Sequence, residues 1–257
     1  NYISTNNSNY KPEPTETQEK FNENYRNLEP LLNRDYFYKR SINDNTINHP
    51  YFNNLIYSLK YTNPVNNQTY NNIAYTMINK KGDIKALAVR NDKFKGAFGD
   101  RKNTMVVSKN PNKSKKPDEI HICETMEDCM SHYQLNQNSL SQKTLKYMAT
   151  QGAVTGDSDT QQITNGQLEM INIAINRINP QKINLGLDND LAGWFYSCKI
   201  LSQIYPDDNF QKTDQLKLSN IETQIKAVKN KDGSKEGIIT FYDRNIKNNP
   251  LPTDNWE

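Results

Sequence analysis

The sequence predicts an α/β protein in which helices flank a parallel sheet, preceded by a small α+β unit. Three observations lead to this prediction. Strand-like and helix-like segments alternate between residues 119 and 204, which is typical of parallel sheets covered by helices on both faces. A polar stretch with two prolines, residues 110–117, precedes the alternation and marks a boundary. Upstream of it, residues 73–89 have the pattern of a β-hairpin.

The first two expected regions are a lead-in and a small α+β unit. Residues 1–14 are polar and rich in Asn, Ser, Thr and Pro, so we expect a flexible lead-in there. Residues 15–110 form the α+β unit. Its expected elements are a helix over 15–32, short helices within 35–62, strands at 73–78, 84–89 and 104–108, and a turn in which Gly82 supplies the positive φ.

The third expected region, residues 111–257, contains the parallel sheet. Strands are expected at 119–124, 146–150, 183–187 and 237–242, and helices at 126–135, 166–178 and 191–204. Residues 211–236 fit either helix or loop.

Composition excludes several classes of protein. The chain has 32 basic and 29 acidic residues, a net charge of +3 that argues against wholesale disorder. No apolar run approaches the roughly 18 residues that a membrane span needs, so we expect no membrane partner. Three cysteines without disulfide-like spacing favour a reducing cytoplasm. Because the chain begins at Asn1 without a Met, we expect it to be a fragment or a processed product.

Acidic residues follow two of the predicted parallel strands. Glu124 follows the first, and Asp188-Asn189-Asp190 follows the third. Working residues of open parallel sheets lie beyond the carboxyl ends of the strands, and clustered carboxylates bind hard cations such as Mg²⁺. The alternative is that Asp188 and Asp190 cap the next helix. The presence of acidic residues at two strand ends favours the metal site.

A second cluster of possible metal ligands lies close by in the sequence. His121, Cys123, Cys129 and His132 could bind a metal, but they lack the paired Cys-x-x-Cys spacing of a zinc ribbon. The favoured interpretation is that His121 and Cys123 share one face of a strand, with Cys129 and His132 on the following helix.

Basic residues are concentrated just upstream of the parallel sheet. Residues 90–116 contain nine Lys and Arg against two Asp, a local charge of +7, with Phe94 and Phe98 interleaved. Phosphate contacts supply most non-specific nucleic-acid affinity, and aromatic rings stack on unpaired bases. The alternative is a solvated loop whose two phenylalanines lie in the core. We predict nucleic-acid binding by Arg90, Lys93, Lys95, Arg101 and Lys102.

The acidic segments resemble the motifs of Toprim domains, which occur in topoisomerases and primases. Residues 122–132, ICETMEDCMSH, resemble the first motif, an apolar strand with a Glu and an Asp four residues on. Residues 187–193, LDNDLAG, resemble the Asp-x-Asp motif with its following Gly. Residues 148–152, MATQG, stand where the family has its second strand and a Gly. Thr125 departs from the Gly or Ser that more often follows the Glu.

The Toprim resemblance, which covers residues 104–250, implies a Rossmann-like parallel sheet and a role for each acidic residue. Asp188 and Asp190 would hold Mg²⁺ or Mn²⁺. Glu124 would be a further metal ligand or the general acid/base. Asp128, one helical turn beyond Glu124, would be an outer or second-metal carboxylate.

The segment before this region resembles primase-like proteins of plasmids and other mobile elements. The resemblance runs through IKALAVRN, residues 84–91, to Gly96. It implies Mg²⁺-dependent nucleotidyl or phosphoryl transfer in replication or mobilisation. The implied partners are single-stranded DNA or an RNA–DNA hybrid, nucleotides, and a relaxase or helicase of the same element. A Toprim-type nuclease and a catalytically idle nucleic-acid-binding module stay open as alternatives.

Overall fold

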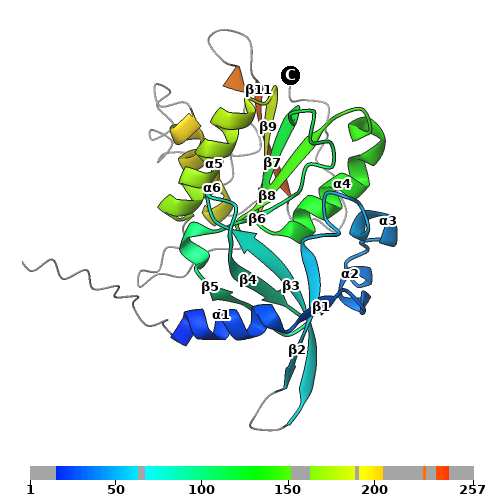
Figure 1. Cartoon of the computed structure of the whole chain (residues 1–257). Coiled ribbons are helices and arrows are strands. Elements are labelled where there is room, and N and C mark those ends of the chain that lie inside the picture. The colour runs from blue at the N-terminus through cyan, green and yellow to red at the C-terminus, as the bar shows by residue number, and fades with distance from the viewer. Residues whose placement is uncertain are drawn as a thin grey trace, which may run out of the picture.

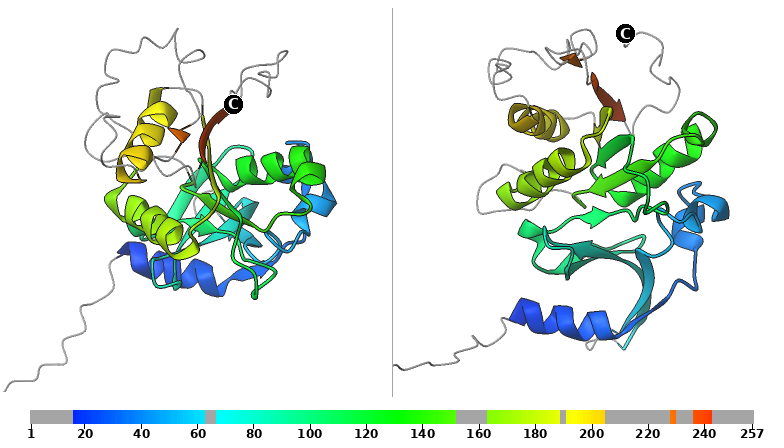
Figure 2. Two further views of the ribbon diagram at one scale, coloured as in Figure 1. Left: turned by 90° about the horizontal axis from the view of Figure 1, so that it is seen from above. Right: turned by 45° about the horizontal axis from the view of Figure 1, so that its top comes forward.

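The computed structural model describes residues 16–62, 67–151, 163–188, 191–204, 228–229 and 236–242. Two β-sheets form the framework, with helices packed against both of them (Figures 1 and 2). Asp190 and the expected lead-in 1–14 lie outside the described residues. None of the described helices is long and apolar enough to cross a membrane.

The first sheet is antiparallel and has five strands in the order β1-β2-β3-β4-β5. Its strands are β1 (Leu28–Pro30), β2 (Ile56–Thr62), β3 (Thr69–Ile78), β4 (Ile84–Arg90) and β5 (Lys95–Gly99). The hairpin between β3 and β4 confirms the sequence prediction, because Gly82 adopts a φ of 89° in the turn. Helix α1 (Glu16–Arg26) packs against β4 and β5 (Figure 1).

The amino-terminal half also contains elements that differ from the prediction. The predicted helix over 15–32 ends at Arg26, and Leu28 instead pairs with Leu59 as part of β1. The short helices expected within 35–62 are α2 (Asp35–Tyr38) and α3 (Asp44–Ile47), but the end of that stretch forms β2. Part of the basic segment forms β5, which was not predicted. Pairing with β2 decides the first difference, and antiparallel pairing with the neighbouring strands β3 and β4 decides the other two.

The second sheet has six strands in the order β10-β11-β9-β7-β8-β6. The four central strands, β11, β9, β7 and β8, are parallel, whereas β10 and β6 pair antiparallel at the edges. In chain order the elements are β6 (Val106–Val107), β7 (Glu119–Cys123), α4 (Met126–Leu140), β8 (Leu145–Ala149), α5 (Asn165–Ile178), β9 (Lys182–Asp188), α6 (Leu191–Ile204), β10 (Val228–Lys229) and β11 (Glu236–Tyr242). The predicted alternation of strands and helices is confirmed.

Helices cover both faces of the second sheet. Side chains from α4 share a buried cluster with Cys123 and Tyr147, while α5 and α6 pack against Ile122 and Leu185 on the opposite face. Alternate residues of each strand point to opposite faces, which accounts for this division. Figure 2 shows α4 on one side of the sheet and α5 with α6 on the other.

The two sheets share a core across the expected boundary at residue 110. The strand expected at 104–108 as part of the first unit is β6, which pairs with β8 at the edge of the second sheet. One buried cluster combines Tyr75 and Ala88 of the first sheet with Val106 and Tyr147 of the second. The amino-terminal elements therefore form one wall of the region where the parallel strands end.

Candidate functional site

The carboxyl ends of two adjacent parallel strands carry acidic residues. β7 and β9 are neighbours, and Cys123 pairs with Gly186. Glu124 follows β7 directly, and Asp188 is the last residue of β9. Both residues therefore lie at the same edge of the sheet, as the sequence predicts. Asp190, the third predicted ligand, lies outside the described residues.

Close packing of α6 against the end of β9 fixes the position of Asp188. A Cβ atom added to Gly193 would lie 1.9 Å from the main-chain oxygen of Asp188. Only glycine permits such an approach. The glycine that follows the Asp-x-Asp pattern therefore has a steric role, which is to let the helix begin beside the strand end.

Two residues that follow β8 donate hydrogen bonds to the main-chain oxygen of Glu124. The amide of Gln151 donates to this oxygen at 2.7 Å, and the Thr150 hydroxyl donates to it at 3.1 Å. On the side-chain side, Nζ of Lys95 lies 3.8 Å from Oε1 of Glu124. The Glu124 side chain is 19% exposed, so a ligand in solution can reach the carboxylate.

Asp128 has a structural role at the start of α4. Its Oδ2 atom accepts from the amide of Thr125 at 2.9 Å and from the Thr125 hydroxyl at 2.6 Å. The Thr125 hydroxyl in turn accepts from the amide of Asp128, which completes a capping box. Thr125, the departure from the family pattern, is thus the N-cap. The predicted metal role of Asp128 stays a prediction.

The donor chemistry of this edge suits a hard cation. Glu124 and Asp188 offer carboxylate oxygens, the ligands that Mg²⁺ prefers, and Mg²⁺ commonly keeps several waters and takes phosphate oxygens from its substrate. Among the residues that the structure describes, no group of three or more His, Cys, Asp or Glu has metal-binding geometry. The metal site stays a prediction.

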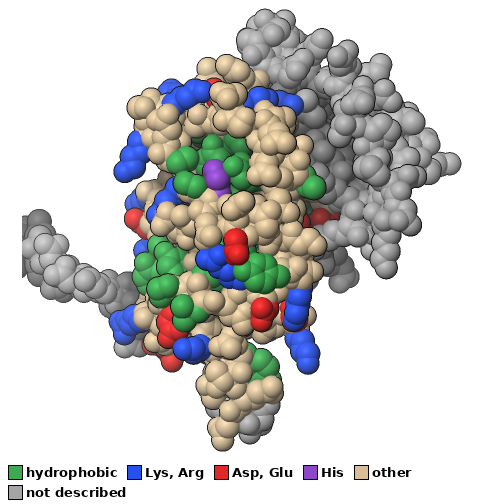
Figure 3. All heavy atoms as spheres, turned by 90° about the vertical axis from the view of Figure 1, so that its right-hand side faces the viewer, with side chains coloured by type: hydrophobic (Ala, Val, Ile, Leu, Met, Phe, Trp, Pro, Cys, Tyr) green, Lys and Arg blue, Asp and Glu red, His purple; other side chains and the backbone are tan. Residues whose placement is uncertain are grey.

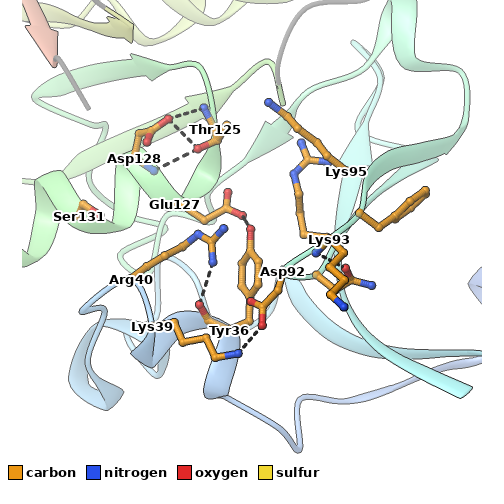
Figure 4. A pocket seen from close by; sticks show the side chains of 13 residues that line it. Tyr36, Lys39, Arg40, Asp92, Lys93, Lys95, Thr125, Glu127, Asp128 and Ser131 are labelled. Carbon is orange, nitrogen blue, oxygen red and sulfur yellow. Dashed lines mark hydrogen bonds and ion pairs between the residues drawn. The ribbon is translucent and has the colours of Figure 1, made fainter. Parts of the chain in front are cut away.

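A cleft of about 690 Å³ opens beside Glu124, between α2, the β4–β5 connection and the start of α4 (Figure 4). Its basic side chains come from both walls, and its acidic side chains are fewer. The basic residues are Lys39, Arg40, Arg90, Lys93 and Lys95, and the acidic ones are Asp92, Glu127 and Asp128. This excess of positive charge favours an anionic ligand.

The five residues predicted to bind nucleic acid occupy different environments. Lys93 and Lys95 are exposed in the cleft. Arg90 is buried and hydrogen-bonded within the protein. Arg101 is half-buried; burial, with a smaller effect of Arg90, lowers its pKa. Lys102 is exposed outside the cleft lining.

Two basic residues of the cleft were missed by the sequence analysis. Lys39 forms an ion pair with Asp92, and the Arg40 guanidinium lies 3.8 Å above the Tyr36 ring. The signal in the sequence is a basic pair directly after an aromatic run, residues 36–38. Lys39 and Arg40 lie beside the basic segment only because the end of α2 contacts the β4–β5 connection in the folded protein.

Glu127 anchors α2 to the start of α4. The Tyr36 hydroxyl donates to Oε1 of Glu127 at 2.7 Å. Burial, together with the neighbouring Glu127 carboxylate, raises the pKa of Tyr36 well above its usual value. The phenol therefore remains a proton donor, and the contact stabilises the cleft wall.

The two phenylalanines of the basic segment differ in burial. Phe94 is 47% exposed and lines the cleft. Phe98 packs against the buried cluster of Phe21, Leu59 and Leu87. The sequence allowed either stacking on bases or packing in the core for these two residues. Phe98 packs in the core, whereas the exposed Phe94 ring is available for stacking on a base.

The His and Cys cluster lies where the favoured interpretation expects it. His121 and Cys123 are in β7, and Cys129 and His132 are in α4; both thiols are buried. The rings of His121 and His132 are 4.5 Å apart between centroids. Figure 3 shows the side of the molecule that carries α3 and α4, where basic and acidic side chains lie next to each other below a group of hydrophobic side chains.

Fold and site together define a mixed α/β protein with acidic residues at the carboxyl ends of parallel strands, beside a basic cleft. No family model matches the chain, and no curated protein matches it. Among solved structures, the primase fragment of the bacteriophage T7 primase-helicase protein is 14% identical, with a TM-score of 0.42, and the match covers 69% of this chain and 66% of that one.

A second similar structure contains the bacteriophage T7 lagging-strand DNA polymerase with the primase domains of two gp4 subunits bound to an RNA/DNA hybrid and dTTP. It is 13% identical, with a TM-score of 0.36, and the match covers 63% of this chain and 65% of that one. The chain thus spans just under two thirds of the length of either matched chain.

Proposed function

We propose that this chain is a Toprim protein of the primase-like type, which transfers nucleotides on single-stranded DNA with Mg²⁺ or Mn²⁺. The observation that carries the proposal is the position of Glu124 and Asp188 at the ends of adjacent parallel strands, beside the basic cleft. The order of Glu, Gly and Asp-x-Asp along the chain supports it further. Replication or mobilisation of a mobile element, with a relaxase or helicase as partner, is the role that we infer.

The acidic edge supplies the reactive groups. Glu124 and Asp188, with Asp190, would hold the metal ion. Bound there, Mg²⁺ would neutralise charge that develops on phosphate oxygens during phosphoryl transfer. Glu124 would alternatively accept a proton from an attacking hydroxyl.

The cleft supplies binding and orientation. Lys93 and Lys95 would contact phosphates, and Phe94 would stack on an unpaired base at the rim. A strand held in this way would pass directly beside Glu124. Holding the template and the reacting nucleotide in one orientation removes much of the entropic part of the barrier.

The test is primer synthesis by the full chain. The protein is incubated with single-stranded DNA, the four ribonucleotides, and Mg²⁺ or Mn²⁺, and the products are resolved on a denaturing gel. New short RNA products are expected. The double variant Asp188→Asn with Asp190→Asn should abolish them, whereas Glu169→Gln, which alters only an exposed ion pair with Lys80, should not.

Two outcomes contradict the proposal. Shortened DNA without new RNA identifies a nuclease, since the same carboxylates and metal can activate water. DNA binding without any product, in either metal, identifies a binding module. Activity that survives the double Asp variant overturns the assignment of the metal site.

A further inference from the structure

The side chain of Arg90 is buried, and both Nη atoms of its guanidinium donate hydrogen bonds to oxygens of the protein. Arg90 is the last residue of β4 and is 4% exposed. Its Nη2 atom donates to the main-chain oxygen of Gln151 at 3.0 Å and to Oε1 of the same residue at 2.9 Å. Its Nη1 atom donates to the oxygens of Gly96 at 3.2 Å and Val89 at 3.1 Å. A guanidinium has five N–H donors, so little of this one is left for a phosphate.

We propose that Arg90 is a positioning residue that holds Glu124 in place through two separate connections. The inference rests on the proposed function, in which Glu124 contacts the metal or the reacting hydroxyl. It also changes the expectation from the sequence, in which Arg90 binds nucleic acid. The two connections reach the main chain and the side chain of Glu124.

The first connection runs through Gln151. This residue is buried and has a φ of 64°, in the left-handed region that is costly for residues other than glycine. Both of its oxygens accept from Arg90, and its amide donates to the Glu124 oxygen at 2.7 Å. The contacts with Arg90 therefore stabilise the strained conformation that directs the Gln151 amide at Glu124.

The neighbouring residues reinforce this first connection. The Arg101 guanidinium lies 3.5 Å from the Gln151 oxygen, and Gln167 of α5 donates to the oxygen of Thr150 at 3.2 Å. Residues of β4 and α5 thus fix Thr150 and Gln151 after the end of β8. These two residues in turn donate hydrogen bonds to the main-chain oxygen of Glu124.

The second connection runs through β5. Arg90 pairs with Lys95 in the antiparallel ladder, and its side chain also binds the oxygen of Gly96. Lys95 is the residue whose ammonium lies 3.8 Å from the Glu124 carboxylate. By fixing the start of β5, Arg90 also fixes the cation that faces Glu124.

The experiment compares Arg90→Lys with Lys60→Gln in the full chain. Lys keeps the charge but has one nitrogen, so it cannot reproduce the planar fork in which Nη2 binds Gln151 while Nη1 binds Gly96 and Val89. Lys60 lies in β2 in an exposed ion pair with Glu29. Two measurements are made: hydrogen exchange of individual amides by NMR, and steady-state primer synthesis. Thermal unfolding of each variant monitors global stability.

Arg90→Lys should increase exchange of the Gln151 amide by about 10-fold or more, while the amides of β3 exchange as before. It should lower kcat by about 10- to 100-fold, as is typical when a residue that orients a ligand is lost. KM for DNA and the salt dependence of binding should not change. Lys60→Gln should alter none of these quantities.

If Arg90→Lys does not fold, Gln151→Ala gives the same test. Alanine at this φ keeps the backbone strain of glutamine and removes the side-chain amide with its Oε1 acceptor, while the main-chain oxygen still accepts from Arg90. The expected changes therefore have the same sign and are smaller. Unchanged exchange at residue 151 in the folded variant overturns the inference.

Loss of DNA affinity with an unchanged kcat would also overturn it, because Arg90 would then be a phosphate ligand. Wild-type protein that makes no primers contradicts the proposed function, yet the exchange measurement still decides whether Arg90 positions Glu124. The two failures are therefore distinguishable.

Discussion

Nζ of Lys95 lies 3.8 Å from Oε1 of Glu124, and this ion pair joins the two sheets of the protein at the candidate site. Lys95 begins the edge strand β5 of the antiparallel sheet, and Glu124 follows the central strand β7 of the other sheet. The acidic edge and the basic cleft are thus parts of one site.

Substitution of Phe94 should weaken binding of single-stranded DNA without lowering stability. The ring is 47% exposed at the cleft, and loss of one base–aromatic stacking contact costs about 1–3 kcal/mol of binding free energy. Phe94→Ala should therefore raise Kd, as measured by fluorescence anisotropy. Phe98→Ala, the matched control, should lower the free energy of unfolding instead, because Phe98 packs in the core. Equal effects of the two variants on stability would contradict this assignment.

Neutralising Lys93 should reduce the salt dependence of DNA binding. Each phosphate contact that is lost lowers the slope of log K against log salt concentration by about 1. Lys93→Gln should show that change, because Lys93 is exposed in the cleft. Lys60→Gln removes the same charge from β2 and should leave the slope as it is. Identical slopes for wild type and Lys93→Gln would exclude Lys93 as a phosphate ligand.

Gly193→Ala should be more destabilising than an alanine at another glycine. Its Cβ would lie 1.9 Å from the Asp188 oxygen, so α6 must move away from β9, and such overpacking costs about 1–3 kcal/mol. Gly82→Ala is the control, since its Cβ would meet no atom within 4 Å and the expected cost is only the strain of a Cβ at positive φ, about 1–2 kcal/mol. Urea denaturation measures both. A smaller loss for Gly193→Ala than for Gly82→Ala would show that the contact is not rigid.

His132 should make the protein less stable as the pH falls. Burial, followed by the effect of His121, lowers the pKa of His132 from its ordinary 6.5 to about 3. The unfolded chain therefore takes up a proton more readily, and this contribution to stability is lost between about pH 6.5 and 3.

The variant His132→Gln isolates this contribution. Its free energy of unfolding should depend less on pH between pH 6 and 4.5, by up to about 1.4 kcal/mol per pH unit. His121, whose pKa burial also lowers, leaves part of the dependence in place. For Glu119, burial alone would raise the pKa, but hydrogen bonds from His121 and Lys143 lower it to about 2. Its stabilising contribution is therefore lost at lower pH, between about 4.5 and 2. Urea titrations with the same slope in wild type and variant would refute the prediction.

Much of the second sheet could be predicted because its elements carry local signals. The apolar runs of β7 and β9 and the periodic apolar residues of α5 each indicate their own element. β5 has no such signal: it contains Lys95, two glycines and a single large apolar residue, Phe98. Backbone pairing with the preceding strand β4 stabilises it, and that pairing does not depend on an apolar pattern in β5 itself.

The sequence by itself determined the alternating strands and helices of the second sheet and the acidic residues at the ends of two of its strands. Glu124 and Asp188 each follow an apolar run that forms a strand, and the carboxyl ends of parallel strands lie at a common edge of the sheet. These two facts are enough to place both residues at that edge. Only the tertiary structure decided that Arg90 is buried and that Lys39 and Arg40 complete the cleft. These roles depend on contacts between residues distant along the chain, and the charge of a side chain does not reveal which partner it meets.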